Sequence, residues 1–136
     1  MVDELRDRIA TYLSSHRVCV ISTTATHGTW AIPAWYRSCA LQVECVFPRW
    51  SDVTYYLTQN PRVLLLILDL ELPGLRWLEY RGAAELVTAP DWENLLPDSQ
   101  LGIQPQARYV AARVKPERID LIDESRGWGL RETLDW

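Results

Sequence analysis

Apolar residues recur every four positions near the start of the chain, at Leu5, Ile9 and Leu13. Because an α-helix turns once in about 3.6 residues, this spacing places the three side chains on one face. The pattern predicts an N-terminal helix over about residues 3–15. Its apolar face is expected to cap one end or edge of the structure that follows.

From residue 17 onward the pattern changes to that of β-strands. The segment 17–23 (RVCVIST) is short and rich in β-branched residues, as a buried strand is. Side chains alternate between two faces in 30–36 and in 41–47, and the second of these segments has one polar face. Between the first two strands stands Gly28, which we expect to supply the positive φ of a tight hairpin.

The middle of the chain predicts a short helix and two further strands. Ser51 is a typical N-cap residue, and Pro61 ends the helix because the residue before a proline disfavours the α conformation. The apolar run 63–68 indicates a strand buried on both faces. The segment 75–87 indicates a long strand in which Gly82 marks a bulge or bend.

The last third predicts one more short helix, which starts at Pro90, and two strands. The strands cover 109–114 and 118–122, with a break at Lys115-Pro116.

Six or so antiparallel strands with small helices between them favour a closed barrel, because closure removes exposed strand edges. The predicted fold class is α+β, mainly β: a closed antiparallel six-stranded β-barrel with small flanking helices. We expect a single domain over residues 1–136, with the helix at about 3–15, the barrel at about 17–122 and a C-terminal tail at 123–136.

Composition and charge agree with an ordinary globular protein. Of the 136 residues 48% are hydrophobic and 24% charged, and the formal net charge of −4 gives no general attraction for nucleic acid or anionic membranes. No stretch approaches the roughly 18 apolar residues of a membrane span, and residues 1–4 lack the basic-then-apolar order of a signal peptide. We therefore expect a cytoplasmic protein with neither nucleic acid nor membrane as a partner.

The cysteines fit the same compartment. Cys19, Cys39 and Cys45 are odd in number and form no CxxC pair, so we expect buried, reduced thiols. With only two histidines to add, a structural metal site is not expected.

The order of motifs resembles the pyridoxamine-5′-phosphate-oxidase-like, FMN-binding split-barrel family over about residues 5–120. The resemblance begins with an Arg-x-hydrophobic strand that ends in Ser-Thr-Thr at 17–24, a glycine hairpin and a Pro-x-Trp-Tyr strand at 33–36. It continues with the helix ending Leu-x-x-Asn-Pro-Arg-Val at 57–63, the strand YRGAAEL at 80–86 and the hairpin-like RVKPERI at 113–119.

This resemblance implies a split barrel that binds FMN in clefts at the interface of a homodimer. It also implies an oxidoreductase in which the flavin exchanges hydride or electrons with a small molecule, while the protein supplies orientation and electrostatics. Seven tryptophans are an independent hint, because aromatic residues are enriched at interfaces and in flat-ligand sites.

The phosphate position departs from the family pattern. The family holds the phosphate with basic and hydroxyl side chains around the serine that opens the short helix. Ser51 is present, but Asp52 and Val53 stand where Arg or Lys usually follows. A carboxylate about 4 Å from a phosphate would cost on the order of 4 kcal/mol at an effective dielectric of about 20.

Arg49 offers a partial replacement, because its guanidinium could grip a phosphate bidentately. Its alternative role is that of a solvated loop arginine, and the alternative for Ser51 is a simple N-cap. Arg37 and Thr54 are further candidates for cofactor binding.

Three aromatic residues lie nearest this predicted cleft: Trp35, Tyr36 and Trp50. They could wall an isoalloxazine ring, or they could fill the barrel or a dimer seam. Trp128 follows the last predicted strand, and the resemblance implies that it could approach the ligand from a partner subunit.

Other chemistry has no support in the sequence. It contains no GxGxxG, GxxxxGK[ST] or GxSxG motif, and no catalytic residue is assigned. Two hypotheses remain: a flavoprotein with FMN, or a cofactor-free or altered-ligand split barrel that binds a deazaflavin or another flat heterocycle.

Overall fold

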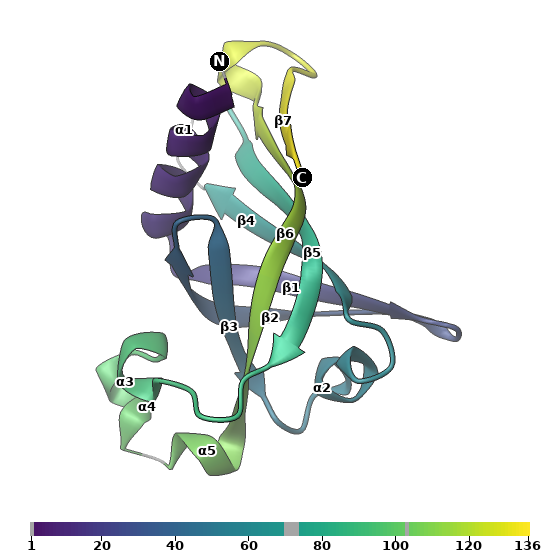
Figure 1. The fold of residues 1–136 in the computed structure, drawn as a ribbon, viewed down its shortest axis with the longest axis vertical. Coiled ribbons are helices and arrows are strands. Elements are labelled where there is room, and N and C mark those ends of the chain that lie inside the picture. The colour runs from purple at the N-terminus through teal and green to yellow at the C-terminus, as the bar shows by residue number, and fades with distance from the viewer. Residues whose placement is uncertain (1, 70–73, 103) are drawn as a thin grey trace.

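The computed structural model describes residues 2–69, 74–102 and 104–136, and within these ranges seven strands form one antiparallel sheet. The strand order is β3-β2-β1-β4-β5-β6-β7, and an additional pairing of β3 with β6 closes the first six strands into a barrel (Figure 1). The predicted closed six-stranded antiparallel barrel is confirmed. The strands are β1 Val18–Ala25, β2 Gly28–Cys39, β3 Gln42–Pro48, β4 Arg62–Asp69, β5 Arg76–Leu86, β6 Tyr109–Asp123 and β7 Arg131–Asp135.

Alternation along the strands produces the core. In β3, Val43, Cys45 and Phe47 are fully buried and face the barrel interior, where they pack with residues of the other strands. Gly28 begins β2 opposite Ala25 with φ +155°, so the predicted glycine hairpin is confirmed.

β6 differs from the prediction, because it runs unbroken through Lys115 and Pro116. Its pairing with β5 shifts register next to Gly82, so Glu117 has no direct partner in β5. A bulge is one of the few places where a strand tolerates proline, which lacks the N–H that a regular ladder needs. The predicted irregularity at Gly82 is thereby confirmed, and it accommodates the proline instead of ending the strand.

Residues 123–136, expected as a tail after the barrel, include a further strand that the sequence did not predict. After the 3₁₀ turn η1 (Glu124–Arg126), β7 pairs with residues 118–122 of β6. β6 is long enough to serve two neighbours on one edge: its first half pairs with β3 and its second half with β7. The sequence prediction missed β7 because a five-residue strand with charged residues at both ends has little apolar periodicity.

Helix α1 (Val2–Ser14) lies against β2 and β7 and matches the predicted N-terminal helix. Ile9, Tyr12 and Leu13 form its buried face. The Tyr12 hydroxyl donates to the carbonyl of Ile67 in β4 at 2.7 Å, which ties the helix to the barrel wall.

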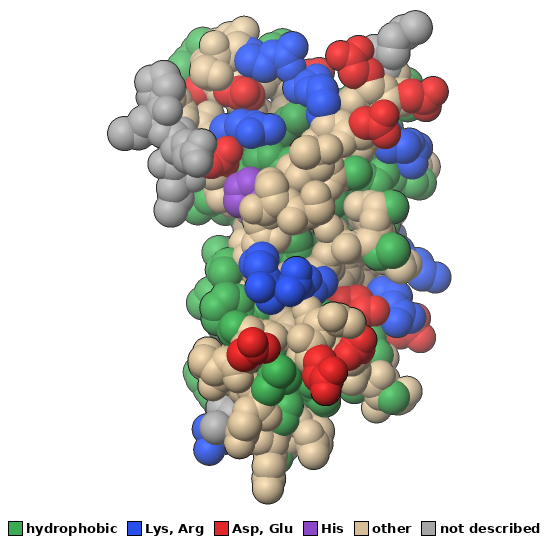
Figure 2. Space-filling view, turned by 90° about the vertical axis from the view of Figure 1, so that its left-hand side faces the viewer, with side chains coloured by type: hydrophobic (Ala, Val, Ile, Leu, Met, Phe, Trp, Pro, Cys, Tyr) green, Lys and Arg blue, Asp and Glu red, His purple; other side chains and the backbone are tan. Residues whose placement is uncertain are grey.

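Short helices lie at the other end of the barrel: α2 (Asp52–Leu57), α3 (Trp92–Leu95), α4 (Asp98–Leu101) and α5 (Pro105–Arg108). α3 begins slightly later than predicted, with Asp91 at the N-cap position. Leu95 and Leu96 pack with Val46 and Ala111 in a second small core on the outer face of β3 and β6. Figure 2 shows the face with α1 and α3, where Lys and Arg side chains lie near the top, among acidic ones, and in a cluster across the middle, with further acidic side chains below it.

The cysteines follow the prediction only in part. Cys19 and Cys45 are buried in the barrel, with their sulfur atoms 3.9 Å apart. Cys39 is exposed, because it is the last residue of β2 and precedes the turn to β3. In the described part of the chain no helix is long and apolar enough to cross a membrane.

Candidate functional site

The segment that connects β3 to α2 carries the most promising functional residues. The backbone N–H of Arg49 donates to the carbonyl of Arg108 at 2.8 Å. One terminal nitrogen of the Arg49 guanidinium donates to the carbonyls of Gln106 at 2.8 Å and Tyr109 at 3.1 Å. The connection is thus held against α5 and the start of β6, and Arg49 is positioned rather than free in solvent.

Ser51 has the predicted N-cap role, since it is buried and its hydroxyl oxygen accepts from the Thr54 N–H at 3.4 Å. The Thr54 hydroxyl donates to the carbonyl of Pro48 at 3.0 Å. Val53 is fully buried in the core, whereas Asp52 is exposed. Asp52 therefore lies in the exposed first turn of α2, and Val53 packs in the core.

A hollow of about 540 Å³, here called the loop hollow, opens beside this connection. Arg49 and Trp50 line one side of it, and Arg108 and Tyr109 line the other. Asp52 is not among its lining residues. The loop hollow thus has two arginines, and the second one comes from α5, far away in sequence.

A second hollow of about 260 Å³, here called the strand hollow, lies on the outer face of β1, β2 and β3. Its walls are apolar and include Val18, Pro33 and Trp35. Pro48 and Tyr109 line both hollows, so the basic and the apolar region adjoin. Trp35 and Tyr109 also pack against the second core, which holds this wall in place.

This arrangement suits a flat ligand with an anionic end. Aromatic and apolar walls favour a planar ring, and paired guanidinium groups favour phosphate or carboxylate. The hollows fall in or near the range of about 300–1,000 Å³ that is usual for small-molecule sites.

The other predicted site residues lie elsewhere. Tyr36 is buried in the barrel and its hydroxyl donates to the carbonyl of Leu13 at 2.7 Å, so it has the core role that was its alternative. Arg37 lines a different hollow of about 250 Å³, and its Nε donates to the carbonyl of Asn94 at 2.6 Å. Trp128 is 91% exposed on the loop between η1 and β7, at the opposite end of the barrel from the β3–α2 connection (Figure 1).

Sequence reasoning missed Arg108 and Tyr109. Both lie close to Arg49 only because β6 pairs with β3, which places Tyr109 directly opposite Pro48. No local pattern marks them, since the contact joins segments about sixty residues apart.

No family model matches the sequence, and no curated protein is similar to it. Solved structures do match the fold. A protein from Clostridium acetobutylicum, related to general stress protein 26 of Bacillus subtilis and of the pyridoxinephosphate oxidase family, superimposes with a TM-score of 0.78 at 14% identity. The match covers 99% of this chain and 96% of that one.

Two further structures bear names that mention bound groups. A heme binding protein from Mycobacterium smegmatis matches with a TM-score of 0.77 at 13% identity, over 96% of this chain and 57% of that one. A FAD-binding protein from Mesorhizobium loti matches with a TM-score of 0.65 at 17% identity, over 80% and 87% of the two chains. The protein therefore has the split-barrel fold of the pyridoxamine-5′-phosphate-oxidase-like proteins, as its motifs predicted.

Proposed function

We propose that the protein is a flavin-binding split barrel that holds FMN across the loop hollow and the strand hollow. The observation that carries the proposal is the junction of the two hollows at Pro48 and Tyr109, with arginines on one side and Trp35 on the other. Similarity of fold to a FAD-binding protein supports the same ligand class.

Each residue has a distinct role in this proposal. Arg49 and Arg108 bind the phosphate, and together they replace the basic pair that is absent at positions 52 and 53. Trp35 and Tyr109 form the wall against the ring. The flavin, when bound, would supply hydride or electron transfer, and the protein would orient it and exclude water from one face.

We also propose a homodimer. Within one chain the η1–β7 loop, which holds Trp128, and the β3–α2 connection, which holds Arg49, lie at opposite ends of the barrel (Figure 1). Trp128 could therefore contact a ligand beside Arg49 only from a second chain. Val18 and Trp50, which line the two hollows, are 50% and 84% exposed, and a second subunit would cover such apolar surface.

The test compares FMN with riboflavin, which lacks the phosphate. Binding is followed by flavin fluorescence and by the absorption spectrum after excess flavin is removed. Arg49→Ala is expected to weaken FMN binding by about 10- to 100-fold, because a charged hydrogen bond is worth about 1.5–3 kcal/mol, and to leave riboflavin binding nearly unchanged. Arg108→Ala should act in the same direction.

Arg37→Ala is the matched control, since it removes the same charge from a different hollow. Arg49→Lys keeps the charge but loses the planar guanidinium group with its several donors. Its affinity for FMN should lie between those of the wild type and Arg49→Ala. If neither flavin binds the wild-type protein, the proposal fails. Riboflavin binding as tight as FMN binding would favour the second candidate, a less charged flat heterocycle.

A further inference from the structure

A further hollow, of about 570 Å³, lies on the outer face of β1, β4, β5 and β6. Three arginines line it, each from a different strand: Arg62 from β4, Arg81 from β5 and Arg118 from β6. We call it the arginine hollow. Its lining shares no residue with the loop hollow or the strand hollow.

Arg81 and Arg118 are direct cross-strand partners. Like charges in directly opposite positions destabilise a sheet, so this pair is unfavourable unless a negative group lies between or beside the two guanidinium groups. Arg62 adds a third positive charge on the neighbouring strand, two residues from Leu64, which is the partner of Arg81 in β4.

Carboxylates pair with all three arginines: Asp120 and Glu79 with Arg81, Asp120 and Asp135 with Arg118, and Glu117, which itself lines the hollow, with Arg62. Asp120 is fully buried, and its Oδ2 accepts from Arg81 and Arg118 at 3.3 Å each and from Arg131 at 3.1 Å. Its other oxygen accepts from the Thr133 hydroxyl. One carboxylate therefore orients three guanidinium groups.

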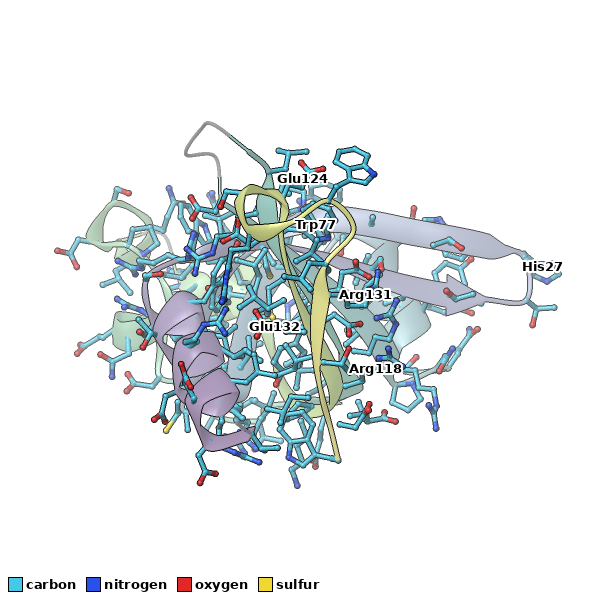
Figure 3. All side chains as sticks on the ribbon, turned by 90° about the horizontal axis from the view of Figure 1, so that it is seen from above. His27, Trp77, Arg118, Glu124, Arg131 and Glu132 are labelled. Atoms are coloured by element: carbon cyan, nitrogen blue, oxygen red, sulfur yellow. The ribbon has the colours of Figure 1, made fainter. Side chains whose placement is uncertain are left out.

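Figure 3 shows Arg118, Arg131 and Glu132 from above. Arg118 and Arg131 lie on the side of β7 from which the β1–β2 hairpin extends, whereas Glu132 points to the side of α1. Arg81 also contacts Glu79 at 3.3 Å, and Arg131 contacts the same residue at 3.5 Å.

The arginines retain donors for a ligand. Arg118 contacts Asp120 through its Nε, and Arg62 contacts Glu117 through one terminal nitrogen at 3.2 Å. The side chains of Arg62, Arg81 and Arg118 are 76%, 44% and 46% exposed. The Arg62–Glu117 pair is an exposed ion pair, a kind that contributes little and that an incoming anion can displace.

The lining also includes hydroxyl groups from Ser22 and Thr24 of β1 and from Thr29 of β2, and the Ser22 hydroxyl donates to the carbonyl of Leu64 at 3.2 Å. The other lining residues are Asn60, Val63, Leu64 and Glu117. Gly82 also forms part of the wall. Guanidinium groups and hydroxyl groups thus line the same hollow, and its volume is usual for a small-molecule site.

We propose that the arginine hollow binds a small molecule through a phosphate group, at a site separate from the proposed flavin site. Phosphate is favoured over carboxylate because it presents three acceptor oxygens in three directions, which suits three guanidinium groups from three strands. The net charge of −4 disfavours general attraction of anions, so tight binding of a small polyanion requires a local site.

The test is calorimetric titration of the full chain with pyrophosphate, with citrate in a parallel titration as the carboxylate probe. We expect saturable pyrophosphate binding that is tighter than citrate binding. Arg62→Gln and Arg118→Gln should each raise the Kd for pyrophosphate by roughly tenfold or more. The Arg62 side chain is exposed and pairs with Glu117 at the surface, so Arg62→Gln should fold normally. This variant therefore remains informative if Arg118→Gln perturbs folding.

Arg113→Gln is the matched control, because Arg113 is in the same strand as Arg118, has a side chain that is 44% exposed and pairs with Glu44 outside the hollow. It should leave the Kd unchanged. Absence of saturable binding to the wild type would overturn the proposal. Equal losses in Arg113→Gln or tighter binding of citrate would overturn it as well. Arg62 and Arg118 do not line the loop hollow, so the effects of their variants distinguish this site from the proposed flavin site.

Discussion

At the scale of single residues, buried tyrosines decide how the barrel interior is tied together. Tyr12, Tyr36 and Tyr80 are almost completely buried, and each donates its hydroxyl to a backbone carbonyl of another element. Burial raises the pKa of all three hydroxyls above the ordinary value of 10.0, so they remain protonated donors at neutral pH. An aromatic side chain of this kind fills core volume and satisfies a carbonyl at once.

Tyr80 gives a prediction at this scale. Its hydroxyl contacts the carbonyls of Leu41 and of Val114, the latter at 3.2 Å. Tyr80→Phe keeps the ring but leaves these buried carbonyls without that donor, so we expect the free energy of unfolding to fall by about 1–2 kcal/mol. Urea unfolding followed by circular dichroism measures the change.

Tyr55→Phe is the control for Tyr80→Phe, because the Tyr55 side chain is 61% exposed. It should change stability by less than about 0.5 kcal/mol. Equal effects of the two variants would show that the Tyr80 hydroxyl adds nothing to stability.

At the scale of elements, the bulge between β5 and β6 brings two backbone segments close together at Gly82. A Cβ at Gly82 would lie 2.3 Å from the carbonyl oxygen of Lys115 and 2.9 Å from a methyl group of Val114. Glycine permits this close approach, and the extra residue in β6 accommodates Pro116.

Gly82→Ala should therefore destabilise the protein by about 1–3 kcal/mol, because backbone atoms must move to relieve the contact. Thermal unfolding followed by circular dichroism is a suitable measurement. At Gly102 a Cβ meets no atom of the described residues within 4 Å and φ is −74°, so Gly102→Ala should be neutral or slightly stabilising. A neutral Gly82→Ala would mean that the bulge adjusts without cost.

A clamp between α1 and β7 gives a pH-dependent prediction. The two terminal nitrogens of Arg8 each donate to one carboxylate oxygen of Glu132 at 2.8 Å. This hydrogen bonding lowers the pKa of Glu132 from its ordinary value of 4.5. The folded state therefore binds the proton less readily than the unfolded state, so the stabilisation is complete above about pH 4.5 and is lost as the pH falls below it.

Glu132→Gln should remove part of this acid sensitivity. The variant is expected to be less stable than wild type at pH 7, by up to about 1 kcal/mol, and closer to it at pH 3. Urea midpoints measured from pH 7 to pH 3 test this. Glu85→Gln, at an exposed position of β5, should leave the difference between pH 7 and pH 3 as in wild type. A difference in urea midpoint between Glu132→Gln and wild type that stays constant from pH 7 to pH 3 would contradict the prediction.

At the scale of the whole molecule, the proposed homodimer is the main open prediction. Light scattering at micromolar concentration should give twice the chain mass of 15.7 kDa. Since we expect Trp50 and Trp128 to be covered by the partner, replacing either with Glu should shift the mass toward that of the monomer. A monomeric wild type would contradict the proposal, and an unchanged mass in both variants would place the interface elsewhere.

Much of the fold could be predicted from the sequence, because local spacing carries it. The helical spacing of Leu5, Ile9 and Leu13 and the alternation in β2 and β3 reflect which face of each element is buried. Motif order predicted the split barrel correctly. β7 and the continuity of β6 through Pro116 were missed, since both depend on which strand lies alongside.

The candidate sites depended much more on the tertiary structure. The sequence by itself determined Ser51 as an N-cap and singled out Arg49 and Trp35. Only the pairing of β3 with β6 brought Arg108 and Tyr109 to Arg49, and only the pairing of β5 with β6 set Arg81 opposite Arg118. The physical reason is that burial periodicity is a property of each segment alone, whereas a binding site requires side chains from distant segments to meet, and strand register decides which of them do.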